Sequence, residues 1–432
     1  MRFPFFIAVM LAHAFAITST AALSATSSAN LSTNPSAGLL SLAQAQRLAA
    51  KDAPQVDAQA AALRAAQQSS LSAAELPDPK LTLGIENLPV DTADRFNLTR
   101  DFMTMRKIGL MQDFTRPEKL KLRADRANAE IRKEEAILSL ATVNLRRDVA
   151  IAWIERYFAE RQLELLKELA RESELQITGA QAALAGGKGQ AADPFAARLA
   201  SAQLADKIID SERLVIRAQI NLARWIGAAA KQPLDLAPAF DQLLHRHAEL
   251  IAGLESHPHL AMYAPLQAIA DSDLRLAEAA KHPDWSLEVA YAQRGPAYSN
   301  MLSVGVRIDL PIFQSRRQDP AIAGKAATAE QIRAQSEDAK RAHTAEIEGM
   351  LADWESANTR LQRYRAELMP LAHARSDIAL ASYRGGKSEL ASVLEARKGE
   401  IEVRMNYLAA QSELARAWAN LNFLIPTSEE NK

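Results

Sequence analysis

Two short stretches, Ala185-Gly186-Gly187-Lys188 and Arg384-Gly385-Gly386-Lys387, lie 199 residues apart and indicate how this chain is built. At the same spacing, Asn221-Leu222 is echoed by Asn420-Leu421. Matches that keep their order over so long a distance are typical of an internal repeat. The sequence therefore predicts two related halves, each of about 200 residues, in a pseudo-symmetric fold.

Each half has the same predicted order of elements: helix, strand, turn, strand, long helix, tight turn and helix. In the second half, residues 285–292 and 303–310 alternate strictly between apolar and polar side chains. In the first half, residues 81–86 alternate in the same way, and a second strand is predicted at about 102–114, where the alternation is weaker. A period of two predicts a sheet with one apolar and one polar face.

Long helices are predicted on both sides of these strands. Residues 118–178 contain neither Gly nor Pro, and at about 1.5 Å per residue they predict a helix roughly 90 Å long. Apolar residues recur every seven positions over 131–166, which predicts a coiled-coil seam, and a second apolar line predicts neighbours on two sides, as in a multi-helix barrel. Helices are also expected over 40–76 and over 318–383, the latter with a kink or break near Pro370.

The composition excludes several classes of protein. The chain has 432 residues and no cysteine, which excludes disulfides, thiolate metal sites, cysteine nucleophiles and a lipid anchor on an N-terminal Cys. Apolar residues make up 48% but aromatic residues only 6%, a balance typical of long packed helices rich in Ala and Leu. The chain has 51 basic and 52 acidic residues, so as a whole it lacks the excess of positive charge that is typical of nucleic-acid-binding proteins. No nucleic-acid partner is therefore expected.

The N-terminus has the pattern of a secretory signal peptide. A positive start at Met1-Arg2 is followed by an apolar stretch over 3–16 and by small residues over 18–22. An uncleaved membrane anchor is the alternative, although the apolar stretch is short for a spanning helix. The predicted divisions of the chain are a signal peptide at 1–25, a flexible segment at 26–39, a first repeat at 40–240, a second repeat at 241–426 and a C-terminal tail at 427–432.

Four amphipathic strands are too few to close a barrel, but three copies of the chain would supply twelve. The strand regions 80–114 and 283–313 are enriched in aromatic residues, as the girdles of a transmembrane barrel are. The alternative is an antiparallel sheet packed on helices in a soluble domain.

The duplicated helix–strand–strand–helix order and the Gly-Gly-Lys turns resemble the TolC-type outer-membrane efflux channel family over about residues 40–426. Segments beside the strands, such as Pro77-Asp78-Pro79, Pro283-Asp284-Trp285 and Asp309-Leu310-Pro311, resemble its CzcC-like heavy-metal efflux subgroup. The resemblance implies a mainly α fold with a small β part. A long periplasmic α-helical barrel would continue into four strands per chain of a trimeric 12-stranded β-barrel in the outer membrane.

The same resemblance implies a function without enzyme chemistry or a cofactor. The chain would be the exit duct of a tripartite system that also contains a periplasmic adaptor (membrane fusion) protein and an inner-membrane pump of the resistance–nodulation–division (RND) type. The subgroup implies export of heavy-metal cations, either cobalt, zinc and cadmium or copper and silver. The alternatives are a channel for drugs or other organic solutes, and a periplasmic coiled-coil adaptor. Many relatives are lipoproteins, whereas this chain would be held in outer-membrane lipid by its strands alone.

The resemblance also assigns roles to particular residues. The turns between paired helices form the periplasmic tip at which the adaptor docks, here Gly186, Gly187 and Lys188, and Arg384, Gly385, Gly386 and Lys387. Acidic residues next to the tips, Asp193 and Glu395, are candidates for the channel constriction or gate. Polar strand positions that would face the barrel lumen are Glu86, Glu288, Arg307 and Asp309. The alternatives are plain helical turns, solvated surface charges and simple solvation of a polar face.

Two further patterns suggest other functions, but each lacks a required residue. The histidines of the segment between the halves, His245, His247, His257 and His259, lack the Glu of an H-E-x-x-H zinc motif, so no metal ligand is predicted. Gly386-Lys387-Ser388 resembles the end of a P-loop, but Ala381 stands where that loop requires Gly, and no strand is predicted before it.

Overall fold

The structure, a computed structural model, describes residues 38–187, 189–244, 247–254 and 257–426, which fall within one compact unit that begins at Gly38. The predicted signal peptide, nearly all of the predicted flexible segment and the predicted C-terminal tail lie outside the described residues.

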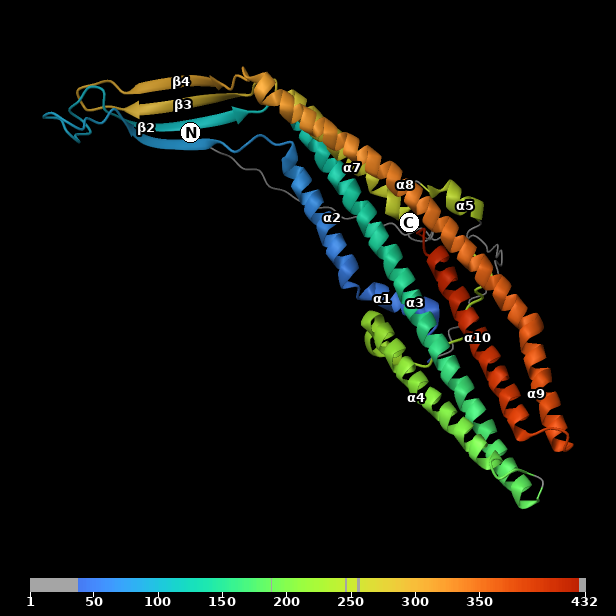
Figure 1. Cartoon of the computed structure of the whole chain (residues 1–432). Helices are drawn as coiled ribbons and strands as arrows, with labels where there is room; N and C mark the ends of the chain where they lie inside the picture. The colour runs from blue at the N-terminus through green and yellow to red at the C-terminus, as the bar shows by residue number, and fades with distance from the viewer. Residues whose placement is uncertain (1–37, 188, 245–246, 255–256, 427–432) are drawn as a thin grey trace, which may run out of the picture. The chain divides into compact units, whose positions relative to one another are not determined.

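The described elements follow one another in the order helix, strand, strand, helix in each half of the chain (Figure 1). The first half contains α1 (Leu42–Lys51), α2 (Pro54–Ala73), β1 (Lys80–Glu86), β2 (Met105–Phe114), α3 (Pro117–Ala185), α4 (Asp193–Ile226) and the short helix η1 (Gly227–Lys231). The second half contains α5 (His247–Ala252), α6 (Pro258–Ala261), α7 (Tyr263–Ala279), β3 (Trp285–Gln293), β4 (Met301–Ile308), η3 (Gln314–Arg316), α8 (Gln318–Arg363), η4 (Tyr364–Leu368), α9 (Met369–Arg384) and α10 (Leu390–Asn422).

The 69-residue helix α3 is the centre of the helical part and packs against α2, α4, α7 and α10 (Figure 1). Its predicted seam is buried at Leu145, Ala152 and Leu166 and half-buried at its other members. The second apolar line is buried at Ile154 and Phe158. Leu145 and Ala152 of the first line and Ile154 and Phe158 of the second belong to the same apolar cluster, so both lines are packed against neighbouring elements. None of the described helices is both long and apolar enough to cross a membrane.

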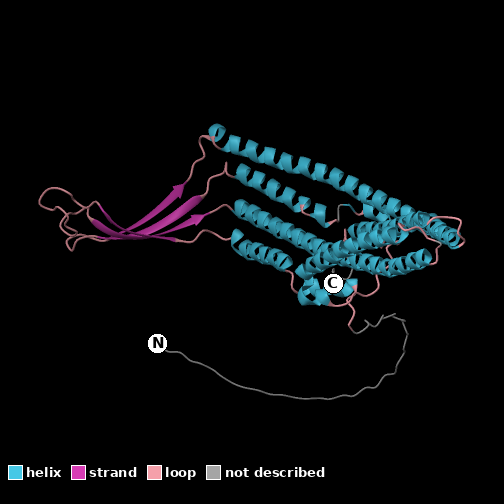
Figure 2. Cartoon of the chain, turned by 60° about the horizontal axis from the view of Figure 1, so that its bottom comes forward, coloured by secondary structure: helices cyan, strands magenta, loops and turns pink. Residues whose placement is uncertain are grey.

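The four strands form one antiparallel sheet in the order β1-β2-β3-β4, which extends from one end of the helices (Figure 2). Its register places all the apolar strand residues that alternation predicted on one face. Leu287 and Phe114 on this face are partly buried. Its other large apolar side chains are between 41% and 70% exposed, so the described residues leave the face largely uncovered: Leu81, Leu83, Ile85, Ile108, Leu110, Trp285, Val289, Tyr291, Leu302, Val304, Val306 and Ile308.

The structure also explains why alternation is weak in the predicted second strand. The strand begins at Met105 and not at 102, because the Asp101 carboxylate accepts the backbone N–H groups of Met103 and Thr104 at 2.7 and 3.1 Å and forms a turn. Within β2, the polar Arg106 and Gln112 lie on the apolar face.

Two predicted helices differ from the structure in how they are interrupted. The expected helix over 40–76 is two helices, because Pro54 has no N–H to donate and begins α2 after a break at residues 52–53. The expected interruption near Pro370 takes the form of the π-helical turn η4, which separates α8 from α9 directly before the proline. There the N–H of Met369 donates to the carbonyl of Tyr364, five residues earlier, so the chain continues as a helix through Pro370.

The two halves are anchored in the same way at their starts. The indole N–H of Trp153 on α3 donates to the carbonyl of Leu40 at 3.0 Å, and that of Trp354 on α8 donates to the carbonyl of Phe240 at 3.0 Å. Donor and acceptor of the second bond lie 201 and 200 residues after those of the first. A tryptophan in each long helix therefore fixes the chain where its own half begins, at Leu40 for the first half and at Phe240, directly before the predicted second repeat, for the second.

Ion pairs hold α7 between the two long helices. The Asp273 carboxylate on α7 bonds Arg126 of α3 at 2.7 Å and Lys325 of α8 at 2.9 Å. Burial raises the pKa of Asp273, but these two cations outweigh it and leave the pKa below its usual value.

Candidate functional site

The two helical turns with the Gly-Gly pattern have the same geometry. Gly186 and Gly385 cap α3 and α9, and each donates its backbone N–H to the carbonyl four residues earlier at 3.0 Å. Gly187 and Gly386 follow with φ of +73° and +70°. This left-handed conformation favours Gly, which explains why both turns have Gly at the second position.

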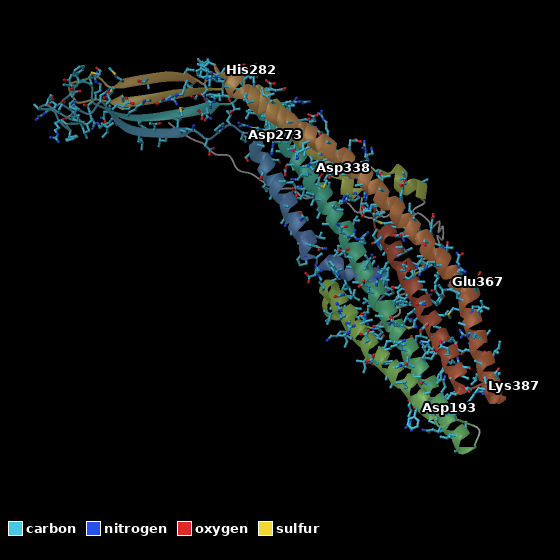
Figure 3. The ribbon with its side chains drawn as sticks, viewed as in Figure 1. Asp193, Asp273, His282, Asp338, Glu367 and Lys387 are labelled. Atoms are coloured by element: carbon cyan, nitrogen blue, oxygen red, sulfur yellow. The ribbon has the colours of Figure 1, made fainter. Side chains whose placement is uncertain are left out.

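The two turns lie together at the end of the helices opposite the sheet, where Figure 3 labels Asp193 and Lys387. The side-chain amide of Gln190 donates to Glu389 at 3.3 Å, which joins the turns directly. Below them a small core packs the helix pairs, made by Ala180, Ala197, Leu390 and Val393. Of the predicted docking residues, Arg384 and Lys387 are exposed, and Lys188 lies outside the described residues.

The two candidate gate residues lie in different environments. The Asp193 carboxylate accepts the backbone N–H of Gln190 at 2.9 Å, while the N–H of Asp193 donates to the carbonyl of Gln190 at 3.1 Å. These two bonds fix the turn before α4, so the Asp193 carboxylate has a structural role there. Glu395 is exposed on α10 and lines a groove between the α3–α4 pair and α10.

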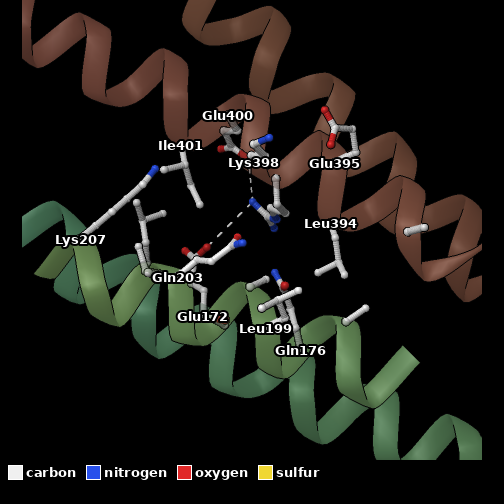
Figure 4. Close-up of a pocket in the computed structure, with 17 residues that line it drawn as sticks. Glu172, Gln176, Leu199, Gln203, Lys207, Leu394, Glu395, Lys398, Glu400 and Ile401 are labelled. Atoms are coloured by element: carbon white, nitrogen blue, oxygen red, sulfur yellow. Dashed lines mark hydrogen bonds and ion pairs between the residues drawn. The ribbon is translucent and has the colours of Figure 1, made fainter. Parts of the chain in front are cut away.

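This groove has a volume of about 360 Å³ and is lined by both apolar and charged side chains (Figure 4). Its lining includes Leu199 and Leu394, together with Glu172, Lys207, Glu395 and Lys398. It lies between elements that are far apart in the sequence, so it could not be read from the sequence.

A buried carboxylate, Glu400, also lines this groove and was not predicted from the sequence. It is 4% exposed and bonds His373 of α9 at 3.1 Å and Arg397 of its own helix at 2.8 Å. Burial raises the pKa of Glu400, but the side chains of Ser376, His373 and Arg397 outweigh it and hold the pKa below its usual value of 4.5. Glu400 therefore ties α9 to α10 near the tip.

The polar face of the sheet brings three of the four predicted lumen residues together. Lys107 of β2 lies 3.1 Å from Glu86 of β1 and 3.1 Å from Glu288 of β3, and Arg307 of β4 lies 4.0 Å from Glu288. Asp309 follows β4, and its backbone N–H donates to the carbonyl of Asp284 at 3.4 Å. Lys107 was not predicted, because its partners come from neighbouring strands.

Two of the four histidines noted in the sequence, His257 and His259, contact His343 of α8. His257 is buried, and its Nδ1 lies 3.1 Å from Nε2 of His343, whose Nδ1 lies 3.0 Å from Glu346. The ring of His259 stacks on that of His343 at 5.0 Å. Among the described residues, no group of three or more His, Asp or Glu converges as it would around a metal ion, and His245 lies outside them.

The conformation of the turns predicts unequal effects of alanine at adjacent glycines. We expect Gly187→Ala to weaken the end of α3 by about 1 kcal/mol, because a Cβ is strained at positive φ. Gly186→Ala should change the stability of this helix end by less than half of that amount, since the φ of Gly186 is −81°. Amide hydrogen exchange of the last α3 turn measures both, and equal protection in the two variants would contradict the assignment.

Comparisons with known proteins agree with this geometry. Residues 252–426, less than half of the chain, match the family model described as "Outer membrane efflux protein". Comparison with curated proteins finds no match.

Solved structures match over nearly the whole chain. A membrane protein from Pseudomonas aeruginosa is 16% identical with a TM-score of 0.78, covering 90% of this chain and 91% of that one. CusC is 16% identical with a TM-score of 0.77, covering 89% and 92%. The outer membrane protein VceC from Vibrio cholerae is 17% identical with a TM-score of 0.74, covering 89% and 95%. This chain therefore has the fold of solved outer-membrane channel proteins, and its second half carries the sequence pattern of outer membrane efflux proteins.

Proposed function

We propose that the chain is a TolC-type outer-membrane efflux channel and acts as the exit duct of a tripartite RND system. The observation that carries this proposal is the sheet at the end of the long helices. It has one apolar face that the described residues leave largely uncovered and one polar face that carries charges. Such a sheet fits a position between lipid and an aqueous lumen.

Assembly as a homotrimer would complete the sheet. In the described part of the chain, β1 and β4 each pair on one side only, and open strand edges invite pairing with further strands. Helix α4 carries a row of apolar side chains that are 57% to 69% exposed, namely Phe195, Leu199, Ile209, Ile216 and Ile220. A second copy of the chain would bury both features, and three copies would close a barrel of twelve strands.

The partners and the cargo follow from the family resemblance. In this proposal a periplasmic adaptor docks at the paired turns and an inner-membrane RND pump supplies the substrate. The strand segments that resemble the CzcC-like subgroup support heavy-metal cations as the cargo, and a drug or other organic solute is the second candidate. Conduction requires neither catalytic residues nor a cofactor.

Purification from outer membranes followed by planar-bilayer recording tests the channel function. We expect a heat-stable trimer that forms discrete aqueous pores. A monomer that is recovered from the periplasm and forms no pores would refute the proposal and favour the adaptor alternative. Growth of a deletion strain on zinc, cobalt, copper or organic toxins then distinguishes the cargo classes.

The constriction role of the tip is tested by Glu395→Ala and Arg384→Ala. Removing a charge from a ring of three copies should raise single-channel conductance or leak, because an ordered charged ring restricts the pore. Glu402→Ala, which removes an exposed charge farther along α10, is the control. Currents equal to wild type in both test variants would exclude these residues from the gate.

A further inference from the structure

Lys107 lies at the centre of the polar face of the sheet. Its side chain is 21% exposed and is held between Glu86 on one neighbouring strand and Glu288 on the other, at 3.1 Å from each. The exposed Arg307 approaches Glu288 from the other side at 4.0 Å. One ammonium group therefore bridges two carboxylates from the middle of the sheet, and with Arg307 the two positive charges balance the two negative ones.

The charges on this face balance one another. The register places six charged strand residues on it, three of each sign: Glu86, Asp113 and Glu288, and Lys80, Lys107 and Arg307. Asp113 pairs with Lys80 at 2.7 Å. The opposite face has one charged residue, Arg106, next to Lys107 in the sequence.

We propose that Lys107 sets the ion selectivity of the strand-lined part of the channel by balancing, together with Arg307, the negative charges of Glu86 and Glu288. This inference rests on the proposed channel function, in which the polar face lines the lumen. Rings of carboxylates make a pore selective for cations. With Lys107 in place the face has no net charge, so this part of the pore discriminates little between cations and anions.

Lys107→Gln tests the assignment by exposing the two carboxylates in each of three copies. In planar bilayers under a KCl gradient near 0.1 M, the ratio of potassium to chloride permeability should rise about threefold, because charges act over about 10 Å at this salt concentration. The rise should nearly disappear at about 1 M, where the screening length is about 3 Å. The double variant Glu86→Gln with Glu288→Gln should shift the ratio in the opposite direction.

Arg106→Gln is the matched control, since it removes the same charge from the adjacent position on the opposite face. It should leave the permeability ratio unchanged. A ratio that does not respond to Lys107→Gln, or that responds equally to Arg106→Gln, would overturn the role of Lys107. If the Lys107→Gln variant does not assemble, the double variant Glu86→Gln with Glu288→Gln serves as the test. An unchanged permeability ratio in that variant also overturns the role of Lys107. Absence of pores in the wild-type protein would instead refute the channel function itself.

Discussion

Trp153→Ala is expected to destabilise the protein by about 3–5 kcal/mol, the usual loss when a large buried aromatic side chain is truncated. Trp153 is fully buried in the largest apolar cluster, where its ring stacks on Tyr157 with centroids 5.3 Å apart. The substitution also removes the hydrogen bond to the Leu40 carbonyl; this carbonyl still accepts the backbone N–H of Asp235 at 3.1 Å, so the lost bond adds only about 1 kcal/mol. Unfolding of the detergent-purified protein in urea, followed by circular dichroism, measures the loss.

The pseudo-equivalent residue supplies a matched control. Trp354 makes the same type of hydrogen bond, to the Phe240 carbonyl, but is only half-buried, so Trp354→Ala should cost less. Trp153→Phe keeps most of the apolar volume and should lose about 1 kcal/mol, the usual net value of one hydrogen bond. If Trp153→Ala were no more destabilising than Trp354→Ala, burial of this anchor would not be the main source of its effect.

Local patterns were sufficient to predict much of this fold. The paired Gly-Gly turns have the positive φ that makes Gly favourable there, and strict alternation correctly predicted both faces of β3 and β4. The break at residues 52–53 was missed because the Ala-rich pattern continues through it, although Pro54 is suited to begin a helix. Such errors arise where a single residue changes the path of the backbone while the apolar periodicity of the sequence continues unchanged.

Contacts between distant segments could not be predicted from the sequence. Lys107 looks like an interruption of a weak strand until the register places it between Glu86 and Glu288. Glu400 looks like an ordinary helix-surface charge until α9 brings His373 against it. In both cases the partners are contributed by separate elements, so the spacing of charges along the chain contains no signal for the pair.

The buried Glu400 carboxylate predicts a stability that depends on pH. Its pKa is lower in the folded protein than the usual value of 4.5, because the side chains around it favour the charged form more strongly than burial opposes it. A group whose pKa is lowered by folding stabilises the protein above its unfolded pKa. That contribution is lost as the pH falls below about 4.5 toward the lower folded pKa.

Glu400→Gln should therefore lower the unfolding free energy by about 2 kcal/mol near pH 7, since a charge-assisted contact to His373 and Arg397 is replaced by a neutral one. The difference from wild type should shrink as the pH falls below about 4.5, because the wild-type carboxylate then becomes neutral as well. Urea unfolding at a series of pH values measures this difference. Glu395→Gln removes the same charge from an exposed position on α10 and should change stability by only a few tenths of a kcal/mol. A difference between wild type and Glu400→Gln that stayed constant from neutral to acid pH would show that packing, and not ionisation, accounts for the role of this residue.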